Sequence, residues 1–254
     1  MSLIIPISLI IFPFFFPFLL IFFISGVYYI ESSFKKGVKM TAEELIAKLG
    51  TEQKTHISHG GGTMEYCFKI VGKRPANGKY PVCMLLHGAG ERGNGSNNGI
   101  QLIHGATDIL AYAESEMEGM IFIAPQCPVE KMWIKAPWNL TEHTMEENPT
   151  KELALALEIL EKEINENDGD RDRIYITGIS MGSFGSWDAI SRMKDYFASA
   201  LVCCGGGDVK QAPELVDLPI YIFHGGIDSV VLPSRSRDMY NAICAAGGKK
   251  APSQ

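Results

Sequence analysis

Residues 173–182 read Arg-Ile-Tyr-Ile-Thr-Gly-Ile-Ser-Met-Gly, and this stretch decides the fold. The run 173–177 predicts a strand that leads directly into a Gly-x-Ser-x-Gly pattern. A sharp turn from this strand into a helix would strain the backbone of Ser180 and lift its hydroxyl clear of the sheet. Gly178 and Gly182 fit such a turn because a Cβ there would collide with neighbouring backbone. The pattern predicts a nucleophilic serine, with an ordinary strand-to-helix turn as the alternative.

A second glycine-rich turn lies upstream. Residues 81–86 form an apolar run typical of a strand buried on both faces of a parallel sheet, and it ends in His87-Gly88-Ala89. Such a turn presents backbone N–H groups at the carboxyl edge of the sheet, although it can also be a simple strand-to-helix connection. We expect the N–H of Ala89, with that of Gly88 next, to form an oxyanion hole together with the N–H of Met181. The side chain of His87 is expected to line the substrate pocket.

A third feature is the acid that follows the apolar run 219–224. Asp228 lies in the loop after this predicted strand, at the edge where α/β sheets place functional residues. A carboxylate here can orient a histidine and stabilise its imidazolium, or it can cap a turn. Because Asp228 follows Ser180 in the chain, the order agrees with the Ser…Asp…His order of α/β-hydrolases.

The remaining pattern alternates strands with helices, which predicts a doubly wound, mostly parallel sheet. Strands are expected at 64–71, 82–86, 120–124, 173–178, 198–203 and 219–224, and helices at 101–115, 149–165, 181–193 and 234–246. Thr41 and Glu44 have the spacing of a capping box and predict a further helix start.

Five segments together resemble the esterase and "predicted peptidase" branch of the α/β-hydrolase superfamily, which is close to dienelactone hydrolase-like and feruloyl or acetylxylan esterase-like proteins. They are LLHGAGERG (85–93), IAPQCP (123–128), RIYITGISMGSFGSWDA (173–189), CCGGGD (203–208) and PIYIFHGGIDSVVLPSRSRDMYNAI (219–243). The resemblance implies an α/β-hydrolase fold and a serine hydrolase. It also implies Ser180 as nucleophile, Asp228 as the triad acid, and an oxyanion hole of the Met181 N–H and the His87–Ala89 turn.

No histidine follows Asp228, where the resembled proteins carry a last strand and then a loop with the catalytic histidine. The six histidines are His56, His59, His87, His104, His143 and His224, and we expect each to be structural or solvated. A serine without a base is a poor nucleophile. The sequence therefore reads as truncated at its C-terminus, and this polypeptide is expected to be inactive or barely active.

The N-terminal segment 1–39 is predicted to lie outside the catalytic domain, 40–254. Residues 1–30 contain no charged side chain and are long enough to span a bilayer. They could be a membrane anchor, in which case the lysines that follow would place the domain in the cytoplasm. Alternatively, Met40 is the true initiator and 1–39 is translated upstream sequence. Both readings predict a cytoplasmic domain, with a membrane as partner only if 1–30 is really translated.

Composition limits the partners. A net charge of −6 argues against nucleic acid as the main partner. The six cysteines form no C-x-x-C pair, so we expect reduced thiols and no metal, and the resemblance implies no cofactor. The long segment 125–148 holds two tryptophans: Trp133 is expected to pack the loop down, whereas Trp138 is expected to pack or to line the substrate pocket.

Three functions follow from these patterns. The first choice is hydrolysis of a small-molecule or carbohydrate-linked carboxylic ester through an acyl-enzyme on Ser180. A serine peptidase of the same fold would use the same chemistry. A non-catalytic binding protein that keeps the pocket without the base is the third.

Overall fold

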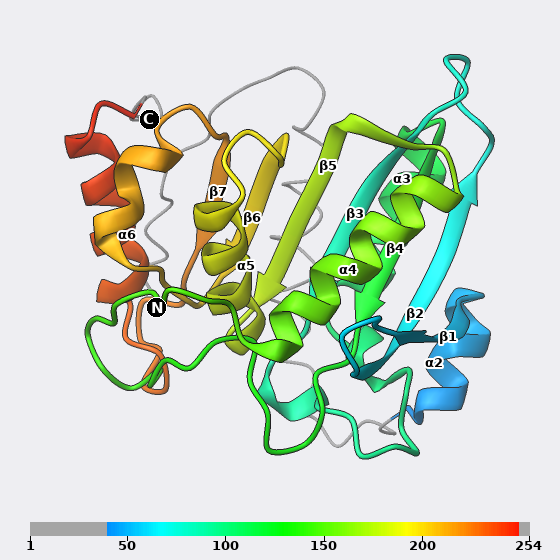
Figure 1. Ribbon diagram of the computed structural model, residues 1–254, viewed down its shortest axis with the longest axis horizontal. Helices are drawn as coiled ribbons and strands as arrows, with labels where there is room; N and C mark the ends of the chain where they lie inside the picture. The colour runs from blue at the N-terminus through cyan, green and yellow to red at the C-terminus, as the bar shows by residue number, and fades with distance from the viewer. Residues whose placement is uncertain (1–39, 249–254) are drawn as a thin grey trace.

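The computed structural model describes residues 40–248, which form a seven-stranded sheet with the strand order β1-β2-β4-β3-β5-β6-β7 (Figure 1). The strands are β1 (Glu52–Ile57), β2 (Thr63–Gly72), β3 (Tyr80–Leu86), β4 (Gly119–Pro125), β5 (Gly169–Ile179), β6 (Ser199–Cys203) and β7 (Ile220–Phe223). The α-helices are α2 (Ala42–Leu49), α3 (Ala106–Glu116), α4 (Lys151–Glu166), α5 (Met181–Arg192) and α6 (Ser234–Ala245). Short 3-10 helices are η1 (Ala89–Glu91), η2 (Ile100–Leu102) and η3 (Val209–Leu215). The expectations for the apolar N-terminal segment and for the end of the chain concern residues outside this range.

The sheet is mostly parallel, as predicted. β3 pairs in parallel with β4 and β5, and the parallel pairing continues through β6 to β7. β2 joins this block antiparallel to β4, and β1 is an antiparallel strand beyond it. The carboxyl ends of the parallel strands therefore meet at one edge, where the segments after β3, β5, β6 and β7 begin.

Two elements differ from the sequence prediction. Strand β1 was not expected because its residues are mostly polar and partly exposed, so it has no apolar alternation to reveal it. The helix expected at 101–115 begins only at Ala106, after η2 and a turn. Gly105 precedes it with φ 82°, a left-handed conformation that no α-helix continues.

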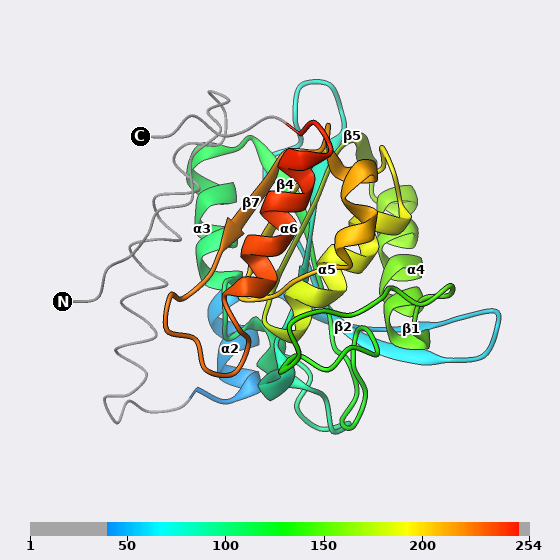
Figure 2. The ribbon, with the colours of Figure 1, turned by 90° about the vertical axis from the view of Figure 1, so that its left-hand side faces the viewer.

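Helices cover both faces of the sheet, and Figure 2 shows α3 and α4 on opposite sides of it. One buried cluster joins the sheet to α4, α5 and α6 and includes Trp133, Leu160, Trp187 and Met239. The other joins the opposite face to α2 and α3 and includes Leu49 and Ile109. This confirms a doubly wound α/β architecture, whose rigid layers hold the carboxyl-edge turns in place.

Local signals set the helix starts. The capping box at α2 is present: Thr41 Oγ1 accepts from the Glu44 N–H, and Glu44 Oε2 accepts from the Thr41 N–H. Thr150 caps α4 by accepting from the Leu153 N–H at 3.1 Å. Within residues 40–248 no helix has the length and apolar character that a membrane crossing requires. All six cysteines are free thiols.

Candidate active site at the carboxyl edge of the sheet

Ser180 lies between β5 and α5 with a strained backbone, φ 53° and ψ −118°. A Cβ at Gly182 would lie 1.9 Å from the Leu86 carbonyl oxygen, and one at Gly178 would lie 2.3 Å from the Gly182 oxygen. Both positions therefore require glycine. The Ser180 N–H donates to the Cys203 carbonyl at 2.8 Å, so β6 also holds the turn. Packing on three strands thus stabilises a conformation that costs on the order of 1–3 kcal/mol by itself.

The expected oxyanion turn lies beside this serine. A Cβ added at Gly88 would be 3.8 Å from the Ser180 Cβ, which places the end of β3 against the nucleophile candidate. Ala89 begins η1 and Met181 begins α5. The N–H groups of a helix's first residues have no intrahelical acceptor, so both are available to a developing negative charge.

His87 is fully buried at the end of β3, with 2 % of its surface exposed. Its Nδ1 donates to the Gly88 carbonyl at 2.6 Å, and its Nε2 accepts from the Cys127 N–H at 2.9 Å. Burial lowers the pKa of His87 to about 4, so the ring is neutral and both nitrogens are satisfied. No polar atom of the ring remains for a substrate, and the place of His87 in a substrate pocket stays a prediction.

The buried ring instead orients the peptide between Gly88 and Ala89. In a trans peptide the C=O and the N–H point in opposite directions. Because His87 holds the Gly88 carbonyl, the Ala89 N–H on the same peptide faces away from the ring. His87 thus fixes the orientation of this peptide.

The loop after β4 packs onto the same turn. Trp133 is fully buried, and its Nε1 donates to the His87 carbonyl at 3.0 Å, which confirms the packing role expected for it. Thr150 at the start of α4 holds the loop from the other side by donating to the Trp133 carbonyl at 2.6 Å. Trp138 is half-buried and packs against the larger core cluster, and its place in a substrate pocket stays a prediction.

Asp228 lies in the loop after β7. Its Oδ1 accepts from the N–H groups of Val230 at 2.9 Å and Val231 at 3.0 Å, which is the turn-capping arrangement. Its Oδ2 lies 3.7 Å from Nε2 of His224. The two oxygens therefore divide the two roles that the sequence left open: one caps the turn, and the other can interact with a histidine.

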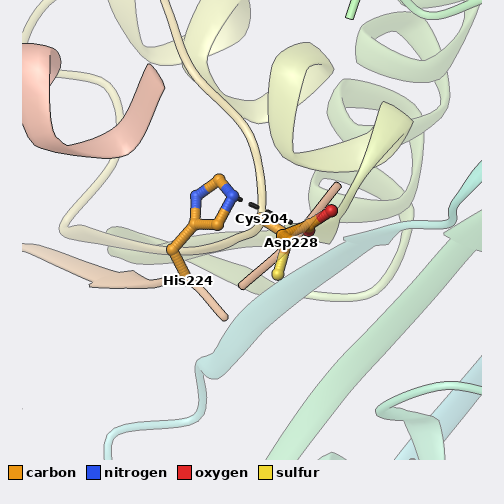
Figure 3. A group of neighbouring side chains, drawn as sticks. All are labelled: Cys204, His224 and Asp228. Carbon is orange, nitrogen blue, oxygen red and sulfur yellow. Dashed lines mark ion pairs between the residues drawn. The ribbon is translucent and has the colours of Figure 1, made fainter. Parts of the chain in front are cut away.

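His224 and Cys204 surround the second oxygen of Asp228 (Figure 3). His224 follows β7 and has a side chain that is 3 % exposed. Cys204 follows β6 with φ 54°, a conformation rare for a residue with a side chain. Ligand atoms of the three residues lie within 4.8 Å of one another. Sequence reasoning missed this cluster, whose one local signal is the cysteine pair that ends β6.

No described residue is hydrogen-bonded to the Ser180 hydroxyl. The two histidines that end sheet strands, His87 and His224, have both ring nitrogens engaged by their own neighbours. A base for Ser180 is thus not supplied by either of them. The hydrogen bonds that cap the turn involve only Oδ1 of Asp228, so Oδ2 of the same carboxylate can still accept a hydrogen bond.

A cavity of about 350 Å³ lies between α6 and the loop after β4, and Arg235 lines it. Arg235 is 2 % exposed, stacks on the Phe184 ring and contacts His143 Nδ1, while its Nε has no hydrogen-bond partner among the described residues. Burial, then the Arg235 charge, lowers the pKa of His143 to about 4. Nothing in the local sequence marks Arg235, because its neighbours Phe184, His143 and Gly206 are distant from it in the chain.

Comparison with known proteins gives the same architecture. A thermostable esterase superposes with a TM-score of 0.68 at 33 % identity, over 78 % of this chain and 52 % of the esterase. A ferulic acid esterase superposes with a TM-score of 0.58 at 20 % identity, over 80 % of this chain and 88 % of the esterase. An acylaminoacyl peptidase of Pyrococcus horikoshii superposes with a TM-score of 0.56 at 14 % identity, over 78 % of this chain and 36 % of the peptidase.

The chain therefore spans about half the length of the esterase that it matches at 33 % identity. No protein-family model and no curated protein sequence matches it.

Proposed function

The chain has the α/β-hydrolase fold and is similar to esterases and peptidases that share it, and on that premise we propose that it is a serine hydrolase of carboxylic esters. The observation that carries the proposal is the strained Ser180 between β5 and α5, beside the free N–H groups of Met181 and Ala89. A strained residue at the carboxyl edge of an α/β sheet is typical of a functional site.

In this reaction Ser180 Oγ attacks the ester carbonyl carbon and its proton passes to a base. The carbonyl oxygen becomes negatively charged and accepts from the Met181 and Ala89 N–H groups, each worth about 3–4 kcal/mol to the transition state. The intermediate expels the alcohol, which takes up the proton, and leaves an acyl-enzyme on Ser180. Water then attacks the acyl carbon and releases the acid.

The base is the incomplete part of this site. A histidine held by Asp228 Oδ2 would complete it, and the sequence contains no histidine after Asp228. In a serine protease whose triad has lost a member, the oxyanion hole and binding still accelerate the reaction by roughly 10³–10⁴ over water. We expect residues 1–254 by themselves to hydrolyse esters at that residual level.

The direct test is labelling by a fluorophosphonate probe, followed by peptide mass spectrometry. Slow labelling confined to Ser180, lost in Ser180→Ala and kept in the exposed-serine control Ser115→Ala, supports the proposal. Imidazole added to the solution should accelerate the labelling, because it replaces the missing base. A well-folded sample with no labelling of Ser180, even with imidazole, would favour the non-catalytic binding protein.

A peptidase is the second candidate, because acylaminoacyl peptidases are among the similar structures. The triad chemistry is the same and the leaving group differs. Parallel assays with a p-nitrophenyl acyl ester and an acylaminoacyl anilide distinguish the two; the ester proposal expects faster release from the ester. Carbohydrate-linked acyl groups are the ester class that we propose to test next. The cytoplasmic location also stays a prediction.

A further inference from the structure

Arg235 is a buried cation that no neighbouring carboxylate pairs with. It is 2 % exposed, and its guanidinium lies over the Phe184 ring, 5.1 Å from the ring centroid. Within residues 40–248 its side chain forms one hydrogen bond, from Nη2 to Nδ1 of His143, and no ion pair. The His143 ring is neutral, because burial and then the charge of Arg235 lower its pKa to about 4. Since burying an unpaired charge is costly, this arrangement favours an anion bound to the guanidinium.

The cavity of about 350 Å³ that Arg235 lines also carries negative charge. It lies where the long loop after β4 reaches α6 (Figure 1). Glu142 from that loop and Asp238 from α6 line it and are exposed, whereas Arg235 and Gly207 form its buried wall. Both carboxylates interact electrostatically with Arg235, but neither comes close enough to form an ion pair. The cavity therefore presents one positive group and two negative groups that do not neutralise one another directly.

We propose that this cavity binds a free α-amino acid, with its carboxylate on the Arg235 guanidinium and its ammonium group facing Glu142 and Asp238. An anion alone would be repelled by the two acids, and an amine alone would leave the guanidinium unpaired. A molecule that carries both charges satisfies both sides of the cavity. Val209 and Ala242 line the same cavity and offer apolar surface to the side chain of the ligand. The volume lies within the range of roughly 300–1,000 Å³ that is usual for small-molecule sites.

The guanidinium is held in position before any ligand arrives. A Cβ added at Gly206 would lie 2.8 Å from the Arg235 Cβ, so the backbone after β6 packs directly against this residue. The Phe184 ring and His143 then fix the guanidinium itself. Its Nε has no hydrogen-bond partner among the described residues. A rigid arginine with free donors loses little conformational entropy when a carboxylate binds, which favours recognition of that group.

Saturation-transfer NMR of the full chain with an equimolar mixture of the proteinogenic amino acids tests the proposal. We expect saturation transfer to at least one of them, and isothermal titration calorimetry should then show one site per chain for the amino acid with the strongest signal. Two analogues of that amino acid, the acid without the ammonium group and the amine without the carboxylate, should each bind about 10-fold more weakly or worse. Each analogue leaves one charge of the cavity without its partner.

Two substitutions remove the two kinds of charge separately. Arg235→Met keeps a long side chain but removes the cation, and it should abolish binding. Asp238→Asn changes an exposed side chain, so the chain should fold as before, and it should weaken binding by about 10-fold. The matched control Asp172→Asn, an exposed acid of β5 that does not line the cavity, should leave the affinity unchanged. If Arg235→Met does not fold, Asp238→Asn decides the outcome.

Absence of saturation transfer to every amino acid, or the same affinity in Asp238→Asn as in the parent, would overturn the proposal. Arg235 would then be a structural cation that packs on Phe184. The proposal does not rest on the hydrolase activity, because Ser180 does not line the cavity. Ser180→Ala should therefore bind the amino acid as the parent does, whether or not Ser180 reacts with the fluorophosphonate probe.

Discussion

The turn at Ser180 and the loop at Asp228 belong to the same candidate site but are built in different ways. The Ser180 turn is enclosed by backbone, and Gly182 approaches the Leu86 carbonyl so closely that no Cβ fits. The Asp228 loop is open: Ile227 is 91 % exposed and Val230 62 % exposed, and the neighbouring strand β7 is only partly buried. Ser180 is therefore held in place by steric exclusion, whereas Asp228 is held by hydrogen bonds to the Val230 and Val231 N–H groups.

The largest expected effect is at Gly182. Gly182→Ala should lower the free energy of unfolding by about 3 kcal/mol or more, because the new methyl group would lie 1.9 Å from the Leu86 oxygen and neither backbone can move freely. The melting temperature in thermal unfolding measures this loss of stability. Gly60→Ala, where the nearest atom is a side-chain oxygen 3.7 Å away, is the matched control. Equal melting temperatures for the two variants would show that the turn is not enclosed as described.

A pH dependence should arise from His87. Its pKa is about 4 in the folded chain, whereas the unfolded value is near 6.5, so between these values the unfolded chain binds more protons. The free energy of unfolding should therefore fall by about 3 kcal/mol as the pH falls from 7 to 4. Chemical denaturation at several pH values measures this slope.

His87→Asn should be less stable at pH 7 and should show a flatter slope, because the titrating group is gone. The exposed-histidine control His59→Asn should keep the slope of the parent. If His87→Asn has the parent's slope, the buried neutral ring is not the source of the pH dependence.

Substitutions in the Asp228 loop should destabilise the protein less than Gly182→Ala does. Asp228→Ala removes the acceptor of the Val230 and Val231 N–H groups and should cost about 1–2 kcal/mol of unfolding free energy. Asp228→Asn keeps an oxygen at that position and should cost less. Urea unfolding of the two variants separates the turn-capping role from the charge. A loss as large as that of Gly182→Ala would contradict the contrast between the regions.

The smallest effect is expected at the tip of the same loop. Ile227→Ser should change the free energy of unfolding by less than about 0.5 kcal/mol, because the side chain is 91 % exposed and buries nothing on folding. A clear loss of stability in the same urea experiment would mean that the tip is covered by a part of the chain outside residues 40–248.

The sequence predicted the parts of the site that depend on neighbouring residues. The strand, the glycine spacing and the helix around Ser180 are local, and so is the turn after β3. The position of Asp228 also followed from one apolar run and a loop. The strand β1 and the start of α3 were missed, because polar side chains and a left-handed Gly105 give no periodic signal.

By itself, then, the sequence determined the α/β architecture and the strained serine, since periodicity and glycine sterics act over a few residues. Only the tertiary structure decided that His87 is buried and fixes the turn after β3, because its partners are Gly88 beside it and Cys127 in a distant loop. The cluster of Cys204, His224 and Asp228 was likewise decided by strand pairing. Parallel strands bring their carboxyl ends together whatever their separation in sequence, and no local pattern records which side chains will meet there.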